Sequence, residues 1–219
     1  MSIPLTDELL LLGYDDTTGK QLLSHELDLG LAGAVLLELA LAERIDVDGG
    51  RVVVRNPAPT GDAIVDAALA RIVADGKRRK PQAWVERLQK KLRAQVLARL
   101  TAAGTVRRVE DKVLGIIPRT RYPAGDPRPK ADARARLDAA VRHGVRPDAR
   151  TAALASLVLA ASLARKVLPD VPRKDAKRRL AEVSAGEWAG PAVRKAIDAV
   201  NAATAAAVVA ATTVAATGS

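Results

Sequence analysis

The chain has 219 residues, enough for one domain or at most two, with a substantial core. Its 35 Lys and Arg residues stand against 25 Asp and Glu residues, and the resulting formal charge of +10 favours anionic partners: nucleic acid, a phospholipid surface or an acidic protein. The absence of cysteine excludes disulfides, thiolate zinc sites and thiol nucleophiles.

The sequence contains no pattern typical of a signal peptide or a spanning helix. Its first 16 residues, "MSIPLTDELLLLGYDD", lack a basic start and a small-residue cleavage site. The longest uncharged internal run, residues 151–164, has 14 residues, whereas a spanning helix needs about 20. The alanine-rich segment from about residue 202, which is expected to be a helix or a tail, is short and weakly hydrophobic. Membrane contact is therefore expected to be peripheral.

Helical patterns dominate the N-terminal part of the chain. Thr6 is expected to cap a helix that continues through Leu12. A second helix is predicted over Gly33–Ile45, where apolar residues recur at helical spacing. Gly49 and Gly50 then lie between two β-favouring runs, which predicts a hairpin.

A second unit of helix followed by hairpin is predicted further along. A helix is expected from about Asp62 to Asp75, with Thr60 or Asp62 as its cap. The next helix opens with Pro81 and closes with Gly104, and residues 105–120 repeat the strand, turn, strand pattern. The two units, residues 33–56 and 82–120, are too loosely alike to be called a sequence repeat.

The remaining elements are again helical. Prolines between residues 118 and 129 predict an irregular connection, and helix resumes over residues 130–144. Residues 151–168 are apolar on nearly every side, as in a helix buried in the middle of a bundle. Two further helices are predicted, at 173–185 and from Pro191 into the tail. The fold class is thus mainly α: a single-domain helical bundle around a buried central helix, with two short β-hairpins, over residues 1–219.

Signatures of catalysis are scarce. No glycine-rich phosphate loop is present, and the two histidines, His25 and His143, are far apart in sequence. Acidic residues are scattered on helices beside Arg and Lys, where solvated ion pairs are the ordinary explanation. We therefore predict no catalytic residue, no metal site and no cofactor.

The helix predicted over residues 81–104 has a basic face. On a helical wheel of residues 84–100, Arg93 lies at the edge of the apolar arc and Arg99 is a misfit inside it. Lys90 and Arg93 are three residues apart, so their charged groups could converge on one anion; the alternative is a solvated helix face. The apolar arc contains Trp84, Val85, Leu88, Leu92, Val96 and Leu100. The opposite face contains Arg87, Lys90 and Lys91.

The second hairpin is unusually apolar for an exposed turn. The stretch "DKVLGIIPRTRYP", residues 111–123, joins an apolar segment to Arg119 and Arg121. Two interpretations compete: a strand whose side chains reach the core, or an exposed tip with a basic collar. The apolar side chains concerned are Val113, Leu114, Ile116 and Ile117.

Six motifs occur in the order seen in one protein family. They are "LLLGYDDTTGK", "GLAGAVLLELALAERI", "PTGDAIVDAAL", "LRAQVLARLTAAG", "VLGIIPRTRYP" and "RTAALASLVLAASLARKVL". Together they cover about Leu5 to Val200, and the chain resembles a bacterial member of the Golgi phosphoprotein 3 family. The Ala- and Arg-rich, Lys-poor composition also indicates a high-GC bacterium.

The resemblance implies a mainly helical domain that binds phosphatidylinositol 4-phosphate at membranes and, in eukaryotes, sorts glycosyltransferases by their cytoplasmic tails. The family's hairpin is associated with membrane contact and self-association. Leu114, Ile116 and Ile117 would then enter the membrane interface, while Arg119 and Arg121 would meet phosphates. The implied partners are anionic phospholipid or phosphoinositide headgroups, cytoplasmic tails of membrane proteins and a second copy of the chain.

Only half of the family's lipid pocket carries over to this sequence. Lys90 and Arg93 stand at its two basic helix positions, with Arg87 on the same face. The positions of a family tryptophan and arginine hold Leu23 and Ala32. Lys in place of Arg also loses the planar fork that grips phosphate in two places. We therefore expect general attraction to anionic lipid with little preference for the 4-phosphate.

These observations predict a non-enzymatic peripheral membrane protein in the cytoplasm, on the inner face of the membrane. A nucleic-acid-binding protein is the first alternative, because a helix followed by a hairpin resembles a winged-helix unit. Against it, basic residues are spread through linkers and loops, and aromatic residues for stacking are few. A structural, oligomer-forming protein is the second alternative.

Overall fold

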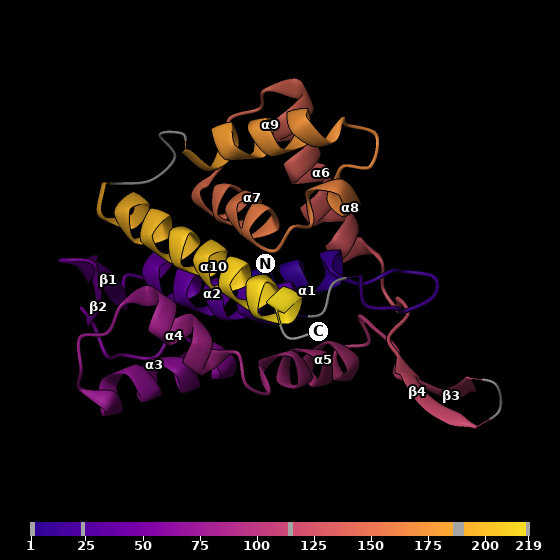
Figure 1. The fold of residues 1–219 in the computed structure, drawn as a ribbon, viewed down its shortest axis with the longest axis horizontal. Coiled ribbons are helices and arrows are strands. Elements are labelled where there is room, and N and C mark those ends of the chain that lie inside the picture. Colours follow the sequence, from indigo (N-terminus) through magenta and orange to yellow (C-terminus); the bar gives the residue numbers. More distant parts are fainter. Residues whose placement is uncertain (1–2, 23–24, 114–115, 186–190, 218–219) are drawn as a thin grey trace.

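The computed structural model describes residues 3–22, 25–113, 116–185 and 191–217, which form a mainly helical body with two hairpins (Figure 1). The predicted fold class is therefore confirmed. In chain order the elements are α1 (Leu5–Leu12), α2 (His25–Leu41), β1 (Ile45–Asp48), β2 (Arg51–Val54), α3 (Ala63–Asp75), α4 (Pro81–Leu88), α5 (Leu92–Ala102), β3 (Val109–Val113), β4 (Ile117–Arg121), α6 (Arg128–His143), α7 (Ala149–Ala160), α8 (Ala164–Val167), α9 (Arg173–Ala185) and α10 (Pro191–Thr217).

Two helices share the centre of the bundle. The predicted central helix, α7, is buried along residues 151–158 and packs against α1, α2, α6, α9 and α10. Helix α2 is equally central, because it contacts α1, α3, α4, α5, α7 and α10. A Cβ on Gly33 of α2 would lie 2.6 Å from the Thr204 hydroxyl oxygen of α10, so the absence of a side chain permits this close packing. A helix that is apolar on all sides is buried on all sides.

Both predicted hairpins are present as antiparallel pairs. Strands β1 and β2 turn at Gly49 and Gly50, whose φ angles of 56° and 71° are in the left-handed region that glycine tolerates. Strands β3 and β4 pair from Val109 with Arg121 to Val113 with Ile117, and this hairpin projects from the body beyond α5 (Figure 1). Pro118 lies inside β4, so the predicted irregular connection begins only after that strand.

Two predicted helices are each divided into two. The helix expected over residues 81–104 ends at Leu88 and restarts at Leu92, with Lys91 at φ 62° between α4 and α5. The helix expected over residues 151–168 is interrupted near Ser162, at φ 57°. Neither break contains Gly or Pro, the residues that usually signal one. The second predicted helix was also placed too late, because α2 begins at His25 and Ile45 belongs to β1.

The predicted caps have different outcomes. Asp62 caps α3, since its carboxylate accepts hydrogen bonds from the backbone N–H groups of Ile64 at 2.9 Å and Val65 at 3.0 Å. Thr60 instead donates its hydroxyl proton to Asp66, 2.7 Å away. The expected Thr6 cap is wrong: α1 starts one residue earlier, and Thr6 is buried inside the helix.

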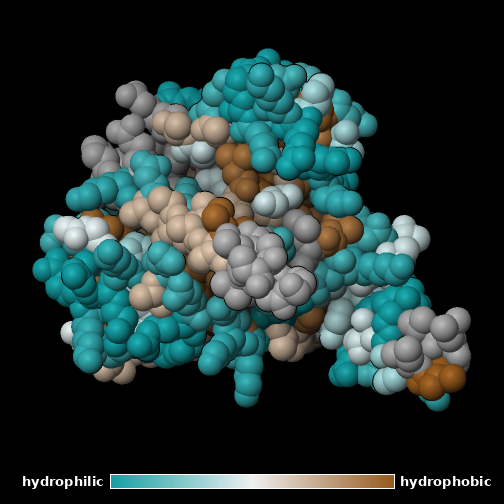
Figure 2. Space-filling view, viewed as in Figure 1, coloured by the Kyte–Doolittle hydropathy of each residue, from teal (hydrophilic) through white to brown (hydrophobic). Residues whose placement is uncertain are grey.

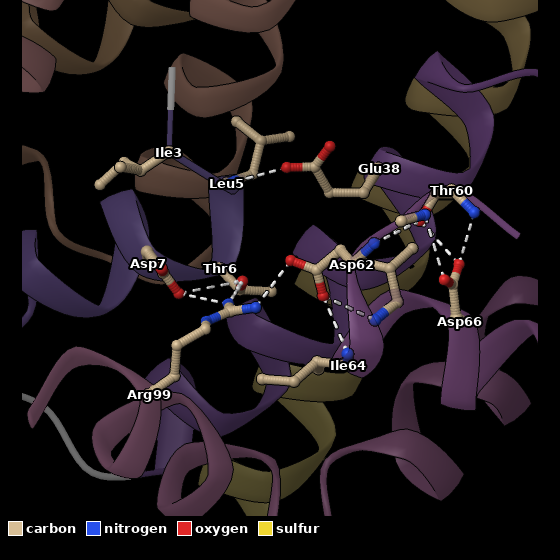
Figure 3. A network of polar contacts seen from close by, with 12 residues as sticks. Ile3, Leu5, Thr6, Asp7, Glu38, Thr60, Asp62, Ile64, Asp66 and Arg99 are labelled. Atoms are coloured by element: carbon tan, nitrogen blue, oxygen red, sulfur yellow. Dashed lines mark hydrogen bonds and ion pairs between the residues drawn. The ribbon is translucent and has the colours of Figure 1, made fainter. Parts of the chain in front are cut away.

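Arginine–carboxylate pairs connect the helices in the interior, and we call these the interior pairs. Arg99 of α5 donates to the Thr6 hydroxyl at 2.9 Å, to the Asp7 carboxylate of α1 and to Asp62 at 2.6 Å (Figure 3). Arg136 of α6 pairs with Glu8 of α1, and Arg150 of α7 pairs with Glu38 of α2 at 2.7 Å. Arg99, which the sequence shows as a misfit inside the apolar arc, therefore links α5 to α1 and to the start of α3.

Burial changes the titration of the acidic members of these pairs. Desolvation raises the pKa of Glu8 to about 7, against the opposing charges of Arg136 and Arg150. It also raises the pKa of Asp7, against the charge of Arg99. Among the described residues, Glu8 Oε2 has no hydrogen-bond partner, which agrees with a carboxyl group that holds its proton more tightly.

Among the described residues, no helix combines the length and the apolar character that crossing a bilayer requires.

Candidate anion-binding site

A pocket of about 810 Å³ lies along α5, and we call it the basic pocket. Three cationic residues, Lys91, Arg93 and Arg108, line it together with one carboxylate, Asp28. Cations that outnumber anions in a concave surface attract anionic ligands. The lining residues are Asp28, Gln89, Lys91, Arg93, Ala94, Leu97, Ala98, Thr101, Ala102, Arg108 and Tyr122.

A second pocket, of about 500 Å³, lies between the α1–α2 loop (residues 13–22) and the base of the projecting hairpin; we call it the hairpin pocket. The two pockets share Arg93, Leu97 and Tyr122, so they adjoin at the Arg93 side chain. The hairpin pocket is lined by Tyr14, Gly19, Lys20, Gln21, Arg93, Leu97, Arg119, Thr120, Arg121 and Tyr122.

The break between α4 and α5 changes which lysine faces the basic pocket. Lys91, in a left-handed conformation, lines the pocket beside Arg93, whereas Lys90 is exposed and does not line it. The premise that Lys90 and Arg93 lie three apart on one helix is therefore wrong. Arg87 is exposed on α4, 3.9 Å from the Asp75 carboxylate, and also lies outside the lining. A role of Lys90 or Arg87 in binding stays a prediction.

The Arg93 guanidinium is already engaged by protein groups. Its Nε donates to Asp28 Oδ1 at 2.6 Å, and Nη2 donates to the second oxygen of the same carboxylate. Nη1 donates to the side-chain oxygen of Gln21 in the α1–α2 loop. Partial burial lowers the pKa of Arg93, but the hydrogen bonds and charge of Asp28 outweigh this, so the pKa lies above its usual value.

Lys91 is the cation of the basic pocket that is most available to a ligand. Within the part of the chain that the structure describes, no carboxylate pairs with its ammonium group. Arg108 pairs with Glu110 at 2.5 Å, but both side chains are more than half exposed, so this pair adds little stability and can exchange with a ligand.

The α1–α2 loop fixes the base of the hairpin. The backbone N–H of Tyr122 donates to the Gly19 carbonyl at 3.0 Å, and the Tyr14 and Tyr122 rings meet edge to face at 6.1 Å. Gly19 has φ 64°, and a Cβ there would lie 2.3 Å from the backbone nitrogen of Pro123. The buried Lys130 ammonium holds the other side of the loop through the Tyr14 carbonyl at 2.5 Å and Asp16 at 2.7 Å. The hairpin is therefore a firmly seated arm.

The tip of this hairpin is exposed. Ile116 is 81% exposed, and Figure 2 shows hydrophobic atoms at the end of the projecting hairpin. The interpretation of the stretch as a core strand is therefore wrong for Ile116. Leu114 and the side chains of Val113 and Ile117 lie outside the described residues.

The two arginines of the collar share one carboxylate. Arg119 donates to Asp111 from Nε at 3.0 Å and from Nη2 at 2.8 Å, and Arg121 donates to it at 2.6 Å. Hydrogen bonding by Arg119, and then by Arg121, lowers the pKa of Asp111 to about 2. The collar thus has one net positive charge and lies beside the hairpin pocket.

The structure describes one of the two residues that replace the family's tryptophan and arginine. Ala32 is fully buried in α2 and lines neither pocket, while Leu23 lies outside the described residues. Among the described residues, no group of three or more His, Cys, Asp and Glu side chains could hold a metal ion.

Sequence reasoning did not identify several pocket residues as site residues. Lys91 was placed on the polar face, which is a partial signal. Asp28 belongs to α2, and Arg108 and Tyr122 flank the projecting hairpin; nothing in their local sequence indicates that they meet α5.

The chain matches a known family over nearly its whole length. The model described as Golgi phosphoprotein 3 (GPP34) matches residues 5–200, the span over which the six motifs occur in order. That span contains both central helices, the projecting hairpin and both pockets. The chain therefore belongs to the Golgi phosphoprotein 3 family.

Proposed function

We propose that this protein is a peripheral, non-enzymatic adaptor that binds anionic phospholipid or phosphoinositide headgroups in the basic pocket. The observation that carries the proposal is the position of three cationic side chains, Lys91, Arg93 and Arg108, beside the base of an arm whose tip exposes Ile116. Cations attract lipid phosphates, and an apolar side chain gains free energy at the acyl boundary. The family is one of non-enzymatic adaptors, which supports the same proposal.

The proposed location is the cytoplasm, at the inner face of the membrane. There the protein would hold cytoplasmic tails of membrane proteins close to the lipid surface. Self-association through the hairpin is part of the same proposal, because the exposed Ile116 could pack against a second copy as well as against lipid.

Vesicle sedimentation tests the lipid part. Vesicles of phosphatidylcholine alone are compared with vesicles that also contain phosphatidylglycerol, and binding should require the anionic lipid and weaken as salt increases. Equal binding to both vesicles contradicts the proposal. A DNA gel shift at matched salt tests the nucleic-acid alternative, and tight DNA binding without vesicle binding would favour it.

A charge reversal locates the surface. Lys91→Glu should weaken vesicle binding by about 1–2 kcal/mol, since each basic residue near an anionic surface contributes about 1 kcal/mol. Lys177→Glu is the matched control, because Lys177 is an exposed lysine on α9, far from the hairpin (Figure 1). Equal losses in the two variants would mean that overall charge, and not the basic pocket, governs binding.

A further inference from the structure

Asp28 occupies the part of Arg93 that a phosphate would use. The Arg93 guanidinium presents Nε and Nη2 as a fork, and both nitrogens donate to the one Asp28 carboxylate. Two parallel bonds from one guanidinium are also the geometry in which arginine binds phosphate. A headgroup phosphate at Arg93 therefore has to displace a carboxylate that the chain itself supplies.

The Asp28 carboxylate is more exposed than the carboxylates of the interior pairs. Its side chain is 24% exposed, against 6% for Asp7 and 2% for Glu8, while Arg93 is 23% exposed, about as much as the arginines of those pairs. Arg93 also lines both pockets, so a ligand could approach the fork from either. Access makes exchange feasible, because a partly solvated pair is weaker than a sealed one.

We infer that Asp28 is a resident counter-anion that competes with the ligand for Arg93 and so lowers the affinity of the pocket for phosphate groups. This inference rests on the proposed function, whose site it describes more closely. While Asp28 holds the fork, only a fraction of molecules can accept a ligand, and the apparent affinity falls by that fraction. A phosphomonoester, which has a charge of about −1.5 to −2 at neutral pH, overcomes this competition better than a singly charged phosphodiester.

Neighbouring groups favour such exchange. Lys91 lies in the same pocket with no carboxylate partner among the described residues, so a ligand gains a second cation when it reaches Arg93. Gln21 holds Nη1 through a neutral oxygen, which keeps the guanidinium in place without occupying the fork. The ligand class is therefore a phosphomonoester, either on a lipid headgroup or free in solution.

The test removes the charge of Asp28 and keeps its shape. Asp28→Asn should bind vesicles containing phosphatidic acid, a phosphomonoester lipid, roughly three- to tenfold more tightly than the parent protein. For vesicles containing phosphatidylglycerol, a phosphodiester lipid, the parent should bind more weakly, and Asp28→Asn should increase the affinity by a similar factor. In a second arm, inorganic phosphate should raise the melting temperature of Asp28→Asn more than that of the parent.

Two controls separate this effect from a change in net charge. Asp46→Asn removes one negative charge from a carboxylate that is 19% exposed, close to the 24% of Asp28, and that pairs with Arg55 far from the hairpin (Figure 1); it should leave binding unchanged within about twofold. Asp28→Glu keeps the negative charge and should show no gain. If Asp28→Asn does not fold, Asp28→Ser serves as a second neutral variant with the same expected gain.

The outcomes distinguish the inference from the proposed function. If a folded neutral variant at residue 28 gains nothing from phosphate, or binds phosphatidic acid more weakly than the parent, Asp28 positions Arg93 and the inference is overturned. If neither protein binds vesicles but phosphate stabilises the neutral variant selectively, the inference holds for a soluble phosphomonoester and the membrane function fails.

Discussion

The interior pairs and the pairs beside the projecting hairpin are built from the same chemical groups in different surroundings. Asp7 and Glu8 are almost fully buried beside their arginines, whereas Asp28 and Asp111 are about one quarter exposed beside theirs. A buried charge that loses its partner has no water to replace it, while an exposed one does. Exposure therefore decides whether an arginine–carboxylate pair holds helices together or can exchange with a ligand.

The largest effect that this comparison predicts is on Arg99. Arg99→Met should lower the free energy of unfolding by about 3–5 kcal/mol, because the buried Asp7 loses the cation that offsets its burial and Asp62 loses its partner. Arg93→Met, the matched change in the exposed pair, should cost about 1 kcal/mol or less. Urea unfolding of the two variants measures the difference. Equal losses would break the distinction between the two kinds of pair.

A second prediction concerns pH. The folded-state pKa of Glu8, about 7, lies above its ordinary value of 4.5, so the folded protein binds the proton more tightly. Stability should therefore decline as pH rises from about 4.5 to 7, by up to about 3 kcal/mol from this residue. Glu8→Gln should flatten the decline in a series of thermal melts. The contribution of Asp7, whose pKa is also raised, remains in the variant.

Asp111 of the hairpin should behave in the opposite sense. Its pKa is lowered from 3.8 to about 2, so its contribution is present above pH 3.8 and is lost as pH falls through 2. Asp111→Asn should therefore leave the melting profile between pH 4.5 and 7 unchanged in slope. If Asp111→Asn made the melting temperature change more or less steeply with pH in that range, the titrations of the interior pairs and of the hairpin would not be independent.

A third, smaller effect concerns the seat of the hairpin. Gly19→Ala should cost about 2–3 kcal/mol, since the left-handed conformation disfavours alanine by about 1–2 kcal/mol and the new Cβ would meet Pro123. Gly76→Ala is the matched control, because its φ of 63° equals that of Gly19 within a degree and nothing lies within 4 Å of its Cβ position. Melting temperature and trypsin cleavage at Arg119 and Arg121 report the two effects. Similar behaviour of both variants would mean that the loop does not hold the hairpin.

The smallest expected effect on stability is at the tip. Ile116→Asp should change the free energy of unfolding by less than about 0.5 kcal/mol, because the side chain is exposed, yet it should weaken vesicle binding several-fold through lost apolar insertion. The double variant with Leu114→Asp should bind more weakly still. Val145→Asp, an exposed apolar residue between α6 and α7, is the control and should bind as the parent does. A large fall in the melting temperature of Ile116→Asp would mean that this side chain packs in the core.

Local patterns predicted most of the fold because each element has its own signal. The glycine pair at residues 49–50, the Asp62 cap and the apolar α7 segment were all found from a few neighbouring residues. The breaks at Lys91 and Ser162 were not found, because each is a non-glycine residue in a left-handed conformation. Such a conformation is unfavourable by itself and is held by the packing around it. No pattern among neighbouring residues in the sequence indicates it.

The site was harder to predict because its contacts are distant in sequence. Arg99 was identified as a misfit, but its partners lie 92 and 37 residues away, at Asp7 and Asp62. Arg93 was placed at the edge of the apolar arc, and nothing near it in sequence indicated that Asp28, 65 residues earlier, binds its guanidinium. A sequence pattern can show that a charge is out of place, but only the fold shows which group balances it.

The firm seat of the hairpin has a consequence for how the protein could rest on a bilayer. From Ile116 to Tyr122 the chain extends about 20 Å along β4, with the apolar tip at one end and the basic pocket at the other. A rigid arm can bring both ends to one flat leaflet only if its long axis lies along the surface. Two contacts so far apart define a line in the plane of the leaflet, which fixes the tilt of the arm and leaves the body free to rotate only about that line and about the membrane normal.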